Sequence, residues 1–492
     1  MAITLGIDCG TQSTKVLCYD SIKKEVISIT TAPHDMISKE DGTREQEASW
    51  YIDALITCFN QIPSEIKQKV EAIGVSGQQH GFVPLDENGN PLYNVKLWCD
   101  TSTANYCDIL TERLGGEEKV FSLIQNQILA GYTASKVLYL KENHPDLYSK
   151  LAHILLPHDY INYYLTGEYV MEDGDTSGTA FYNVEKREWS DEVLKAIDSE
   201  RDLKETLPKI LKTSEVVGTI REEVAKKLGI NKDAIVSVGG GDNMMGAIGA
   251  GCTSDGDLVM SLGTSGTLFG YSEKLIADKK NRLAAFISSS GGYLPLLCTM
   301  NCTVATEQIR TLLDLGVKEL DLIANESKAG ANGIIFLPYF NGERTPNYPK
   351  AEAVIAGMNM TNTNRANIAR ASLESAIYSM KVGLEAFKEQ GFKPAKIILI
   401  GGGAKSKIWA QIVSDMFNLD VMTPLITETA AFGGALQSLA TLEKKSVKEI
   451  TDIHTQFNKE KIFTPNKENY DLYKKGYEKY QKYDSSLSNL FK

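Results

Sequence analysis

One carboxylate with unusual neighbours stands near the middle of the chain. Asp242 follows a run of three glycines, 239–241, and precedes Asn243. Residues 234–238 predict a short buried strand, and the small apolar residues 243–251 predict a helix. Because glycine allows close backbone approach, this pattern presents the carboxylate at a strand end, where open α/β sheets hold their reactive groups. The alternative is a structural role, in which Asp242 only caps the helix.

A second set of candidate residues lies in the first turn of the chain. The runs 3–8 and 15–20 predict two strands of a hairpin. Its turn offers backbone N–H groups and hydroxyls to phosphate oxygens, and Lys15 adds positive charge. The turn residues with this expected role are Gly10, Thr11 and Gln12. Asp8 precedes the turn and is suited to hold Mg²⁺ through water. Taken alone, the pattern is more typical of an ordinary edge hairpin.

The same strand–turn–strand pattern returns at residues 257–271. Gly263 and Thr264 take the places of Gly10 and Thr11, and Ser261 takes the place of Asp8. A repeat of this length predicts two related domains that face each other over a cleft, with a metal site in the first copy only. Two opposed phosphate-binding turns with a carboxylate between them favour phosphoryl transfer.

Polar and aromatic residues follow two further predicted strands, 73–77 and 95–101. Gln79 and His80 come after the first of them, and Trp98 and Asp100 end the second. Donors, acceptors and a flat apolar face are what a polyhydroxylated ligand needs. The alternative is structural, because a histidine or tryptophan at a strand end is often part of the packing.

A glycine turn after the apolar strand 397–400 is a candidate for nucleotide binding. It contains Gly402, Gly403 and Ala404 and leads into a predicted helix, 407–418. The chain has neither a Walker A loop nor a GxGxxG motif, which disfavours a P-loop or dinucleotide-binding site.

Length and composition limit the class of protein. The chain has 492 residues, 42% hydrophobic and 23% charged, and a net charge of −11, which argues against nucleic acid or an anionic membrane as the main partner. We expect two domains, 1–244 and 245–450, followed by a helical tail, 451–492, whose tyrosines form a packing face. The absence of a signal peptide, of long apolar runs and of paired cysteine motifs predicts a cytoplasmic protein.

Together these motifs resemble the FGGY family of carbohydrate kinases along nearly the whole chain. The resemblance rests on 6–11, the segment around Lys136, 239–243, 261–265, 336–339 with 342–346, and 401–404. It implies an α/β protein with the two-domain actin/hexokinase-like (ribonuclease H-like) ATPase fold and a cleft between the domains. It also implies ATP as co-substrate and Mg²⁺ as the metal.

The resemblance also implies a role for each candidate residue. Asp242 would be the base that takes the proton from a sugar hydroxyl, and Asp8 would sit beside Mg²⁺ and the transferred phosphate. The ketose would be held by Gln79, His80, Asp242 and Asn243, with Trp98 and Asp100 nearby. The turns at Gly10-Thr11 and Gly263-Thr264 would contact phosphates, and Gly402, Gly403 and Ala404 the adenine side of ATP.

Within the family, residues 77–81 and 239–243 are most similar to the xylulokinase branch, with Gln79 in place of the usual methionine. The expected reaction is therefore phosphorylation of D-xylulose to D-xylulose 5-phosphate in pentose catabolism. A sister kinase acting on ribulose or a polyol is the alternative within the enzyme class. An actin-like ATPase with a chaperone or assembly role is the alternative from another class. A homodimer is compatible with the resemblance.

Overall fold

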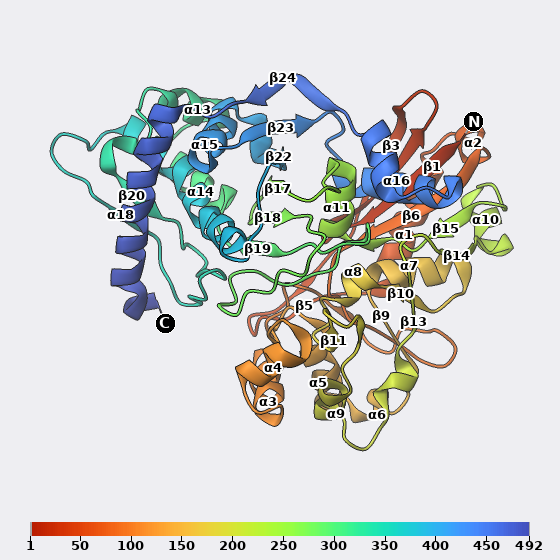
Figure 1. The fold of residues 1–492 in the computed structure, drawn as a ribbon. Helices are drawn as coiled ribbons and strands as arrows, with labels where there is room; N and C mark the ends of the chain where they lie inside the picture. The colour runs from red at the N-terminus through yellow and green to blue at the C-terminus, as the bar shows by residue number, and fades with distance from the viewer. Residues whose placement is uncertain (1, 492) are drawn as a thin grey trace.

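The computed structural model describes residues 2–491 and contains two large sheets, one in each half of the chain (Figure 1). The strands of the first sheet run in the order β14-β15-β6-β1-β2-β3, with β16 beside β6. Their bounds are β1 Ile3–Cys9, β2 Ser13–Asp20, β3 Glu25–Pro33, β6 Val70–Gly77, β14 Val216–Thr219, β15 Ile235–Ser237 and β16 Gly240–Gly241.

The second sheet repeats this arrangement, in the order β19-β18-β17-β22-β23-β24. Its strands are β17 Asp257–Leu262, β18 Gly266–Gly270, β19 Leu296–Thr299, β22 Lys396–Ile400, β23 Asp420–Pro424 and β24 Phe457–Phe463. In each sheet the first hairpin is antiparallel, and its first strand pairs in parallel with the strand on its other side. The predicted hairpins and the internal repeat are therefore confirmed, and the repeat extends over both sheets.

The helices and the small sheets surround these two large sheets. The helices are α1 Ala48–Asn60, α2 Ser64–Lys67, α3 Ala104–Arg113, α4 Glu117–Ile124, α5 Thr133–Asn143, α6 Pro145–Tyr148, α7 Pro157–Thr166, α8 Asp173–Thr176, α9 Asp191–Ile197, α10 Glu222–Leu228, α11 Asp242–Ala250, α12 Thr303–Leu312, α13 Val317–Asn325, α14 Arg365–Glu389, α15 Lys407–Phe417, α16 Thr429–Glu443, α17 Val447–His454 and α18 Lys467–Phe491. The short strands are β4 Ile37–Ser38, β5 Arg44–Gln46, β7 Val83–Leu85, β8 Val95–Lys96, β9 His153–Leu155, β10 Val170–Glu172, β11 Tyr182–Asn183, β12 Glu188–Trp189, β13 Lys209–Leu211, β20 Ile335–Leu337 and β21 Val354–Ala356.

Two helices join the halves. α11 follows the first sheet but packs its apolar residues with those of β17, β18 and β22 in the second sheet. α16 follows the second sheet but lies against β1 and β6 of the first, and the two helices pack on each other (Figure 1). Each sheet is thus covered by the helix that comes from the other half.

Glycines allow this packing because they bring backbones into direct contact. A Cβ on Gly249 of α11 would lie 1.9 Å from the carbonyl oxygen of Thr429, and one on Gly433 of α16 would lie 1.9 Å from that of Met245. On the sheet side, a Cβ on Gly6 would lie 1.6 Å from the carbonyl oxygen of Ala431. No side chain fits at such distances, so these positions require glycine.

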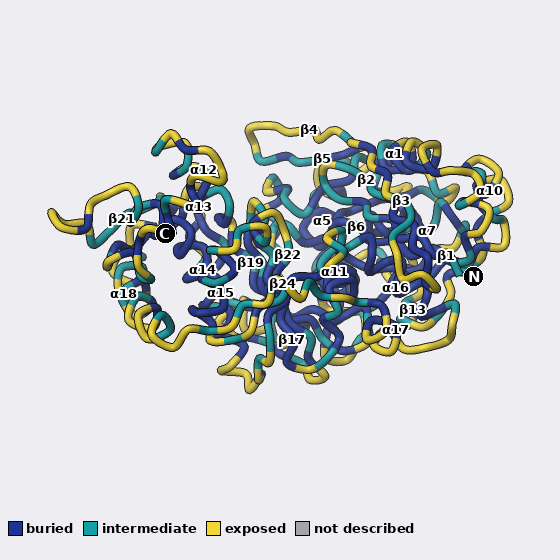
Figure 2. Tube along the Cα trace, turned by 90° about the horizontal axis from the view of Figure 1, so that it is seen from above, coloured by how far each residue is buried: buried dark blue, intermediate teal, exposed yellow. Residues whose placement is uncertain are grey.

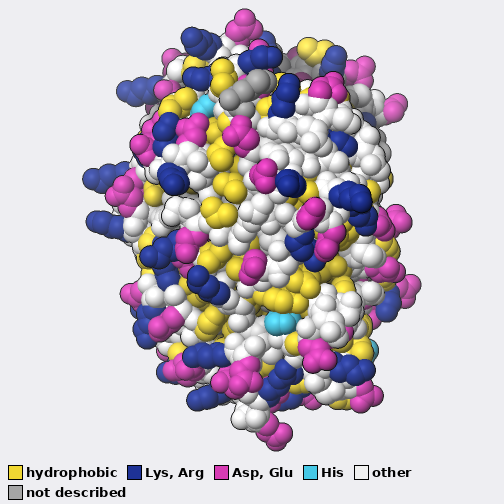
Figure 3. All heavy atoms as spheres, turned by 90° about the vertical axis from the view of Figure 1, so that its right-hand side faces the viewer, with side chains coloured by type: hydrophobic (Ala, Val, Ile, Leu, Met, Phe, Trp, Pro, Cys, Tyr) yellow, Lys and Arg dark blue, Asp and Glu magenta, His cyan; other side chains and the backbone are white. Residues whose placement is uncertain are grey.

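Buried residues form a core within each half and further clusters between the halves (Figure 2). One cluster draws only on residues 3–238 and two only on residues 258–491, whereas three mix residues from both. The expected division at 244/245 and 450/451 stays a prediction. The face in Figure 3, on the side of the N-terminal half, carries lysines and arginines interspersed with aspartates and glutamates. In the part of the chain that the structure describes, no helix has the length and apolar character of a membrane span.

Several expected elements differ from those observed. Residues 112–123 have the sequence pattern of one helix, but Gly115 and Gly116, whose φ angles are +93° and +102°, interrupt it, so that α3 and α4 are separate. The tail is not wholly helical, because residues 457–463 form β24 on the edge of the second sheet. The many charged residues of this segment obscure the alternation that would predict a strand. Backbone pairing with β23 stabilises the strand instead. In α18 the predicted packing face is confirmed by the buried Tyr473, Tyr477 and Tyr480.

Gly249→Ala should lower the free energy of unfolding by roughly 1–3 kcal/mol, because its methyl group would force α11 and α16 apart. Gly246→Ala is the matched control in the same helix, since its nearest neighbouring atom would lie at 3.9 Å. It should leave stability unchanged or raise it by up to about 1 kcal/mol, because alanine is the better helix former. Urea unfolding of both variants measures the difference, and equal losses would contradict the packing argument.

Candidate active site

Asp242 lies at the start of α11, directly after β16. The pairing of β16 with β6 sets Gly240 opposite Ser76 and Gly241 opposite Gly77. The N-cap of the helix is Gly241, not Asp242, so the alternative that Asp242 is only a helix cap is wrong. The carboxylate is half-buried and its Oδ1 accepts hydrogen bonds from the Asn243 backbone N–H at 2.7 Å and from Asn243 Nδ2 at 3.0 Å.

Asp8 lies beside Asp242 because of strand register. It sits one residue before the end of β1, opposite Ser76 of β6, which in turn is opposite Gly240 of β16. The Ser76 hydroxyl donates to Asp8 Oδ1 at 3.0 Å. Three adjacent strands therefore place the two carboxylates, 234 positions apart in sequence (242 − 8), in the same site.

Both carboxyl groups hold protons more tightly than usual. Burial, followed by the charges of Asp8 and Asp175, raises the pKa of Asp242 to about 7, against the hydrogen bonds from Asn243. Burial raises the pKa of Asp8 to about 6, although the Ser76 hydrogen bond and the Lys15 charge lower it. A carboxylate with a pKa near 7 is a far better proton acceptor than an exposed aspartate.

The loop after β6 lies against α11. Asn243 Nδ2 donates to Gln79 Oε1 at 2.7 Å, and a Cβ on Gly241 would lie 2.6 Å from Gln79 Cγ. The last glycine of the run therefore makes room for Gln79. Gln79 Nε2 and His80 Nδ1 are both buried and have no hydrogen-bond partner among the residues that the structure describes. Adjacent buried polar atoms without partners indicate a place for ligand hydroxyls or water.

His80 is held as a neutral imidazole. Burial, followed by the charges of Lys136 and Arg344, lowers its pKa well below the usual value. A neutral imidazole has one donor and one acceptor nitrogen, which suits a sugar hydroxyl. The guanidinium of Arg344 comes from the second half of the chain and lies against Tyr132 and Cys298.

Trp98 and Asp100 have different surroundings. Trp98 Nε1 donates to Thr11 Oγ1 at 2.9 Å, which joins it to the first turn. Both Asp100 oxygens are taken: Oδ2 accepts from Lys96 Nζ at 3.0 Å and from the Arg44 N–H at 2.9 Å, and Oδ1 accepts from the Ser102 hydroxyl and N–H. Asp100 thus holds its own loop in place, and its predicted contact with sugar stays a prediction.

The two predicted phosphate turns have similar backbones but different neighbours. In the first, the Gly10 N–H donates to the Ser13 carbonyl and the exposed Gln12 accepts from the His34 N–H through its carbonyl. Lys15 forms a 2.5 Å ion pair with Glu428, which belongs to the second half. Its positive charge is therefore paired with a carboxylate from the second half.

In the second turn, the carbonyls of Gly263 and Thr264 accept from the backbone at the start of α12. The glycine turn of Gly402, Gly403 and Ala404 lies next to it: a Cβ on Gly403 would come within 2.7 Å of Leu262 Cβ. The structure therefore brings together two predicted ATP-contacting segments that lie more than a hundred positions apart in sequence.

Some residues of the site escaped prediction from sequence. Lys136, Tyr132, Asp175 and Arg344 surround the His80 loop, and Glu428 meets Lys15. Asp175 belongs to a polar run, 173–179, whose pattern predicts a loop that either lines the cleft or caps it, and the other residues come from distant elements whose meeting no local pattern reveals.

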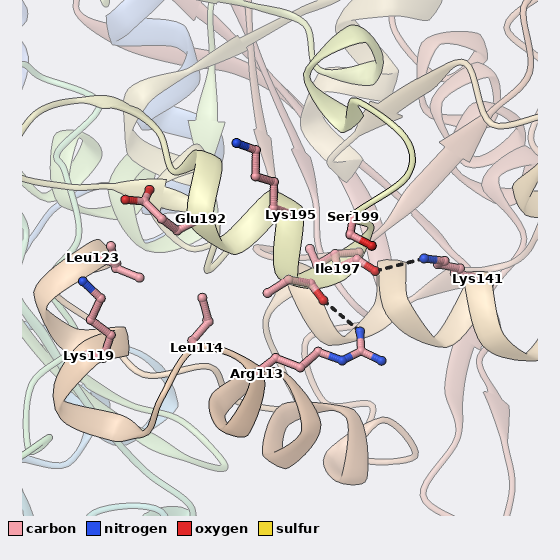
Figure 4. Close-up of a pocket in the computed structure, with 10 residues that line it drawn as sticks. Arg113, Leu114, Lys119, Leu123, Lys141, Glu192, Lys195, Ile197 and Ser199 are labelled. Carbon is pink, nitrogen blue, oxygen red and sulfur yellow. Dashed lines mark hydrogen bonds between the residues drawn. The ribbon is translucent and has the colours of Figure 1, made fainter.

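A separate hollow of about 580 Å³ lies between α3, α4, α5 and α9 (Figure 4). Arg113 and Lys141 at its wall are already occupied, by the Ala196 carbonyl at 2.8 Å and by Asp198 at 2.9 Å. None of the predicted site residues lines it.

Comparison with known families matches the chain to the FGGY family of carbohydrate kinases, with its N-terminal domain over residues 3–249 and its C-terminal domain over 258–442. The chain belongs to this family and is a sugar kinase with ATP as its phosphoryl donor. The resemblance found in the sequence is thereby confirmed.

Individual relatives are similar to this chain along most of their length. The chain is 42% identical to a xylulose kinase of Haemophilus influenzae, over 98% of this chain and 99% of the relative. It is 33% identical to a xylulose kinase of Streptomyces rubiginosus, over 89% and 88%. The solved structure of a xylulose kinase from Bifidobacterium adolescentis superimposes with a TM-score of 0.82 at 29% identity, over 96% and 99% of the two chains. The predicted two-domain kinase fold is confirmed.

Asp100→Asn should lower the free energy of unfolding by up to about 3–5 kcal/mol, because it removes one of the two carboxylates that pair with the buried ammonium of Lys96. Glu45 remains as the other partner of Lys96, at 3.0 Å. The Michaelis constant for sugar should change by less than about threefold. Unfolding and steady-state kinetics measure the two effects. An unchanged stability together with a raised Michaelis constant would instead place Asp100 in contact with sugar.

Proposed function

We propose that this protein transfers the γ-phosphoryl group of ATP to D-xylulose, giving D-xylulose 5-phosphate. The observation that carries the proposal is the site around Asp242: a carboxylate with a pKa raised to about 7 beside the unpartnered buried atoms of Gln79 and His80. The near full-length similarity to xylulose kinases supports the choice of sugar.

The carboxylate of Asp242 orients the reacting hydroxyl and accepts its proton. In a loose phosphoryl-transfer transition state the proton leaves late, so correct orientation of the hydroxyl matters as much as base strength. Asn243 fixes one oxygen of Asp242 and also Gln79, so the base and the sugar-binding loop are held as one unit. His80 and Gln79 supply hydrogen bonds to the remaining hydroxyls.

The donor set around Asp8 fits Mg²⁺. Asp8 and Asp242 are two hard oxygen ligands whose mutual repulsion raises the pKa of Asp242, and a divalent cation would relieve it. Among the described residues no group of three or more acidic, histidine or cysteine side chains is arranged as a metal cage, which suits an ion that keeps several waters. Asp8 would hold the ion, mainly through water. When bound, Mg²⁺ supplies neutralisation of the phosphate charge.

The ATP phosphates would contact the turns at Gly10-Thr11 and Gly263-Thr264, with Gln12 and Lys15 at the first turn. The adenine side would contact Gly402, Gly403 and Ala404. The adjacency of the last two segments in the second sheet supports this assignment. A homodimer stays a prediction.

Sugar-dependent release of ADP tests the proposal, with xylulose, ribulose, glycerol and no sugar. Xylulose should give the highest kcat/KM. Asp242→Asn should lower kcat by roughly 10²–10⁴, the range that general-base catalysis contributes. Binding of ATP should persist in the variant.

A higher kcat/KM for ribulose would overturn the choice of sugar and keep the reaction. ATP turnover without any sugar, undiminished by Asp242→Asn, would overturn the kinase assignment of this site.

A further inference from the structure

His80 has a backbone conformation that residues other than glycine rarely adopt. Its φ is +63°, in the left-handed region. Such a conformation costs roughly 1–3 kcal/mol and persists only where the surroundings determine it. The position of the His80 side chain therefore depends on the groups that hold its main chain.

Two polar side chains hold the main chain of His80. Its carbonyl accepts from Lys136 Nζ at 2.7 Å and from Thr133 Oγ1 at 3.2 Å. Asp175 lies near the backbone of His80 and is fixed by His158, whose Nδ1 lies 2.9 Å from Asp175 Oδ2.

The imidazole ring is fixed as firmly as the main chain. It packs edge-on against Tyr132, with ring centroids 4.7 Å apart, and against Phe286 at 5.5 Å. A Cβ on Gly178 would lie 2.0 Å from His80 Cε1, so the ring fills the space that only glycine leaves. The ring is thus held on three sides, and its buried Nδ1 has no hydrogen-bond partner among the described residues.

Lys136 is the residue in this arrangement whose burial costs the most free energy. Its side chain is fully buried at the start of α5, and its ammonium donates to two backbone carbonyls, of His80 and of Gly131 at 2.8 Å. Asp100, whose charge acts on Lys136, is itself paired with Lys96. A buried ammonium that is bonded only to neutral carbonyls contributes less to the stability of the fold than a packed apolar side chain of the same length would. Its compensating effect is the fixed position of His80.

We propose that Lys136 is a positioning residue for sugar binding: it holds His80 in the left-handed conformation from which the imidazole meets the ketose. This inference rests on the proposed function for the identity of the ligand. Lys136 is not among the predicted sugar contacts, and its role is exerted through one other residue, His80. That dependence on His80 separates it from a general contribution to stability.

A double-mutant cycle on the full-length chain tests the dependence. The variants are Lys136→Met, His80→Ala and the double variant, each measured for kcat/KM with xylulose and for the Michaelis constant of ATP. Two residues that act through one contact are not additive, whereas independent residues are.

Lys136→Met should lower kcat/KM for xylulose by at least about tenfold in the native background and by less than about twofold in the His80→Ala background. The Michaelis constant of ATP should stay within about twofold throughout. Equal losses in both backgrounds, no loss in the native background, or an equal rise in the Michaelis constant of ATP would each overturn the inference.

Lys381→Met is the matched control. Lys381 is also a buried lysine that donates to a backbone carbonyl, that of Met416 at 3.1 Å, but it lies in α14. It should affect thermal stability without changing kcat/KM for xylulose in either background. A loss of sugar use equal to that of Lys136→Met would show a general effect of removing buried lysines and would overturn the inference.

If Lys136→Met does not fold, Thr133→Val carries the same cycle, because Thr133 donates to the same carbonyl. The expected loss is about threefold in the native background and none in His80→Ala; no loss, or equal losses, would overturn the inference. If the native chain uses no sugar, the proposed function fails and the inference with it. Native turnover with an additive cycle overturns the inference alone.

Discussion

Burial of the Asp242 carboxylate beside the charge of Asp8 is the constraint on which the site depends. Parallel pairing of β1 with β6 and of β6 with β16 brings the two groups together, and the glycine run leaves room for Gln79 beside them. Burial and the neighbouring charge raise the pKa of Asp242 to about 7. The same arrangement creates a proton acceptor for a sugar hydroxyl and a negative site suited to a divalent cation.

This arrangement needs a rigid frame that both halves share. α11 carries Asp242 at its first turn and packs on the second sheet, while α16 comes from the second half and packs on the first. Backbone contacts at Gly249 and Gly433 lock the two helices together. Asp242 is thus attached to both sheets, and a shift of one half relative to the other would be transmitted to the start of α11. Closure of the halves around substrates, the usual means by which kinases exclude water, would act through this helix pair.

Sequence alone predicted the elements whose patterns are local. Both hairpins, the strand and helix around Asp242, and the helix α15 after the strand 397–400 follow from alternation, helical period and glycine turns. It did not predict β24, because its charged residues lack an apolar alternation. The surroundings of Asp100 and His80 could not be predicted either, because Lys96, Lys136 and Arg344 meet them only through tertiary packing.

Thermal unfolding of the native chain and of Asp242→Asn, without nucleotide, between pH 5.5 and pH 8.5 tests the central claim most directly. Because the folded-state pKa of Asp242 is raised to about 7, its folded form binds a proton that the unfolded form has already lost, so its contribution to stability falls as pH rises towards 7. Asparagine carries no charge and has no such loss. The account predicts that the variant gains in melting temperature over the native chain as pH rises, and that the gap levels off above about pH 7. A gap that does not change with pH, or a variant that becomes the less stable of the two at high pH, would contradict it.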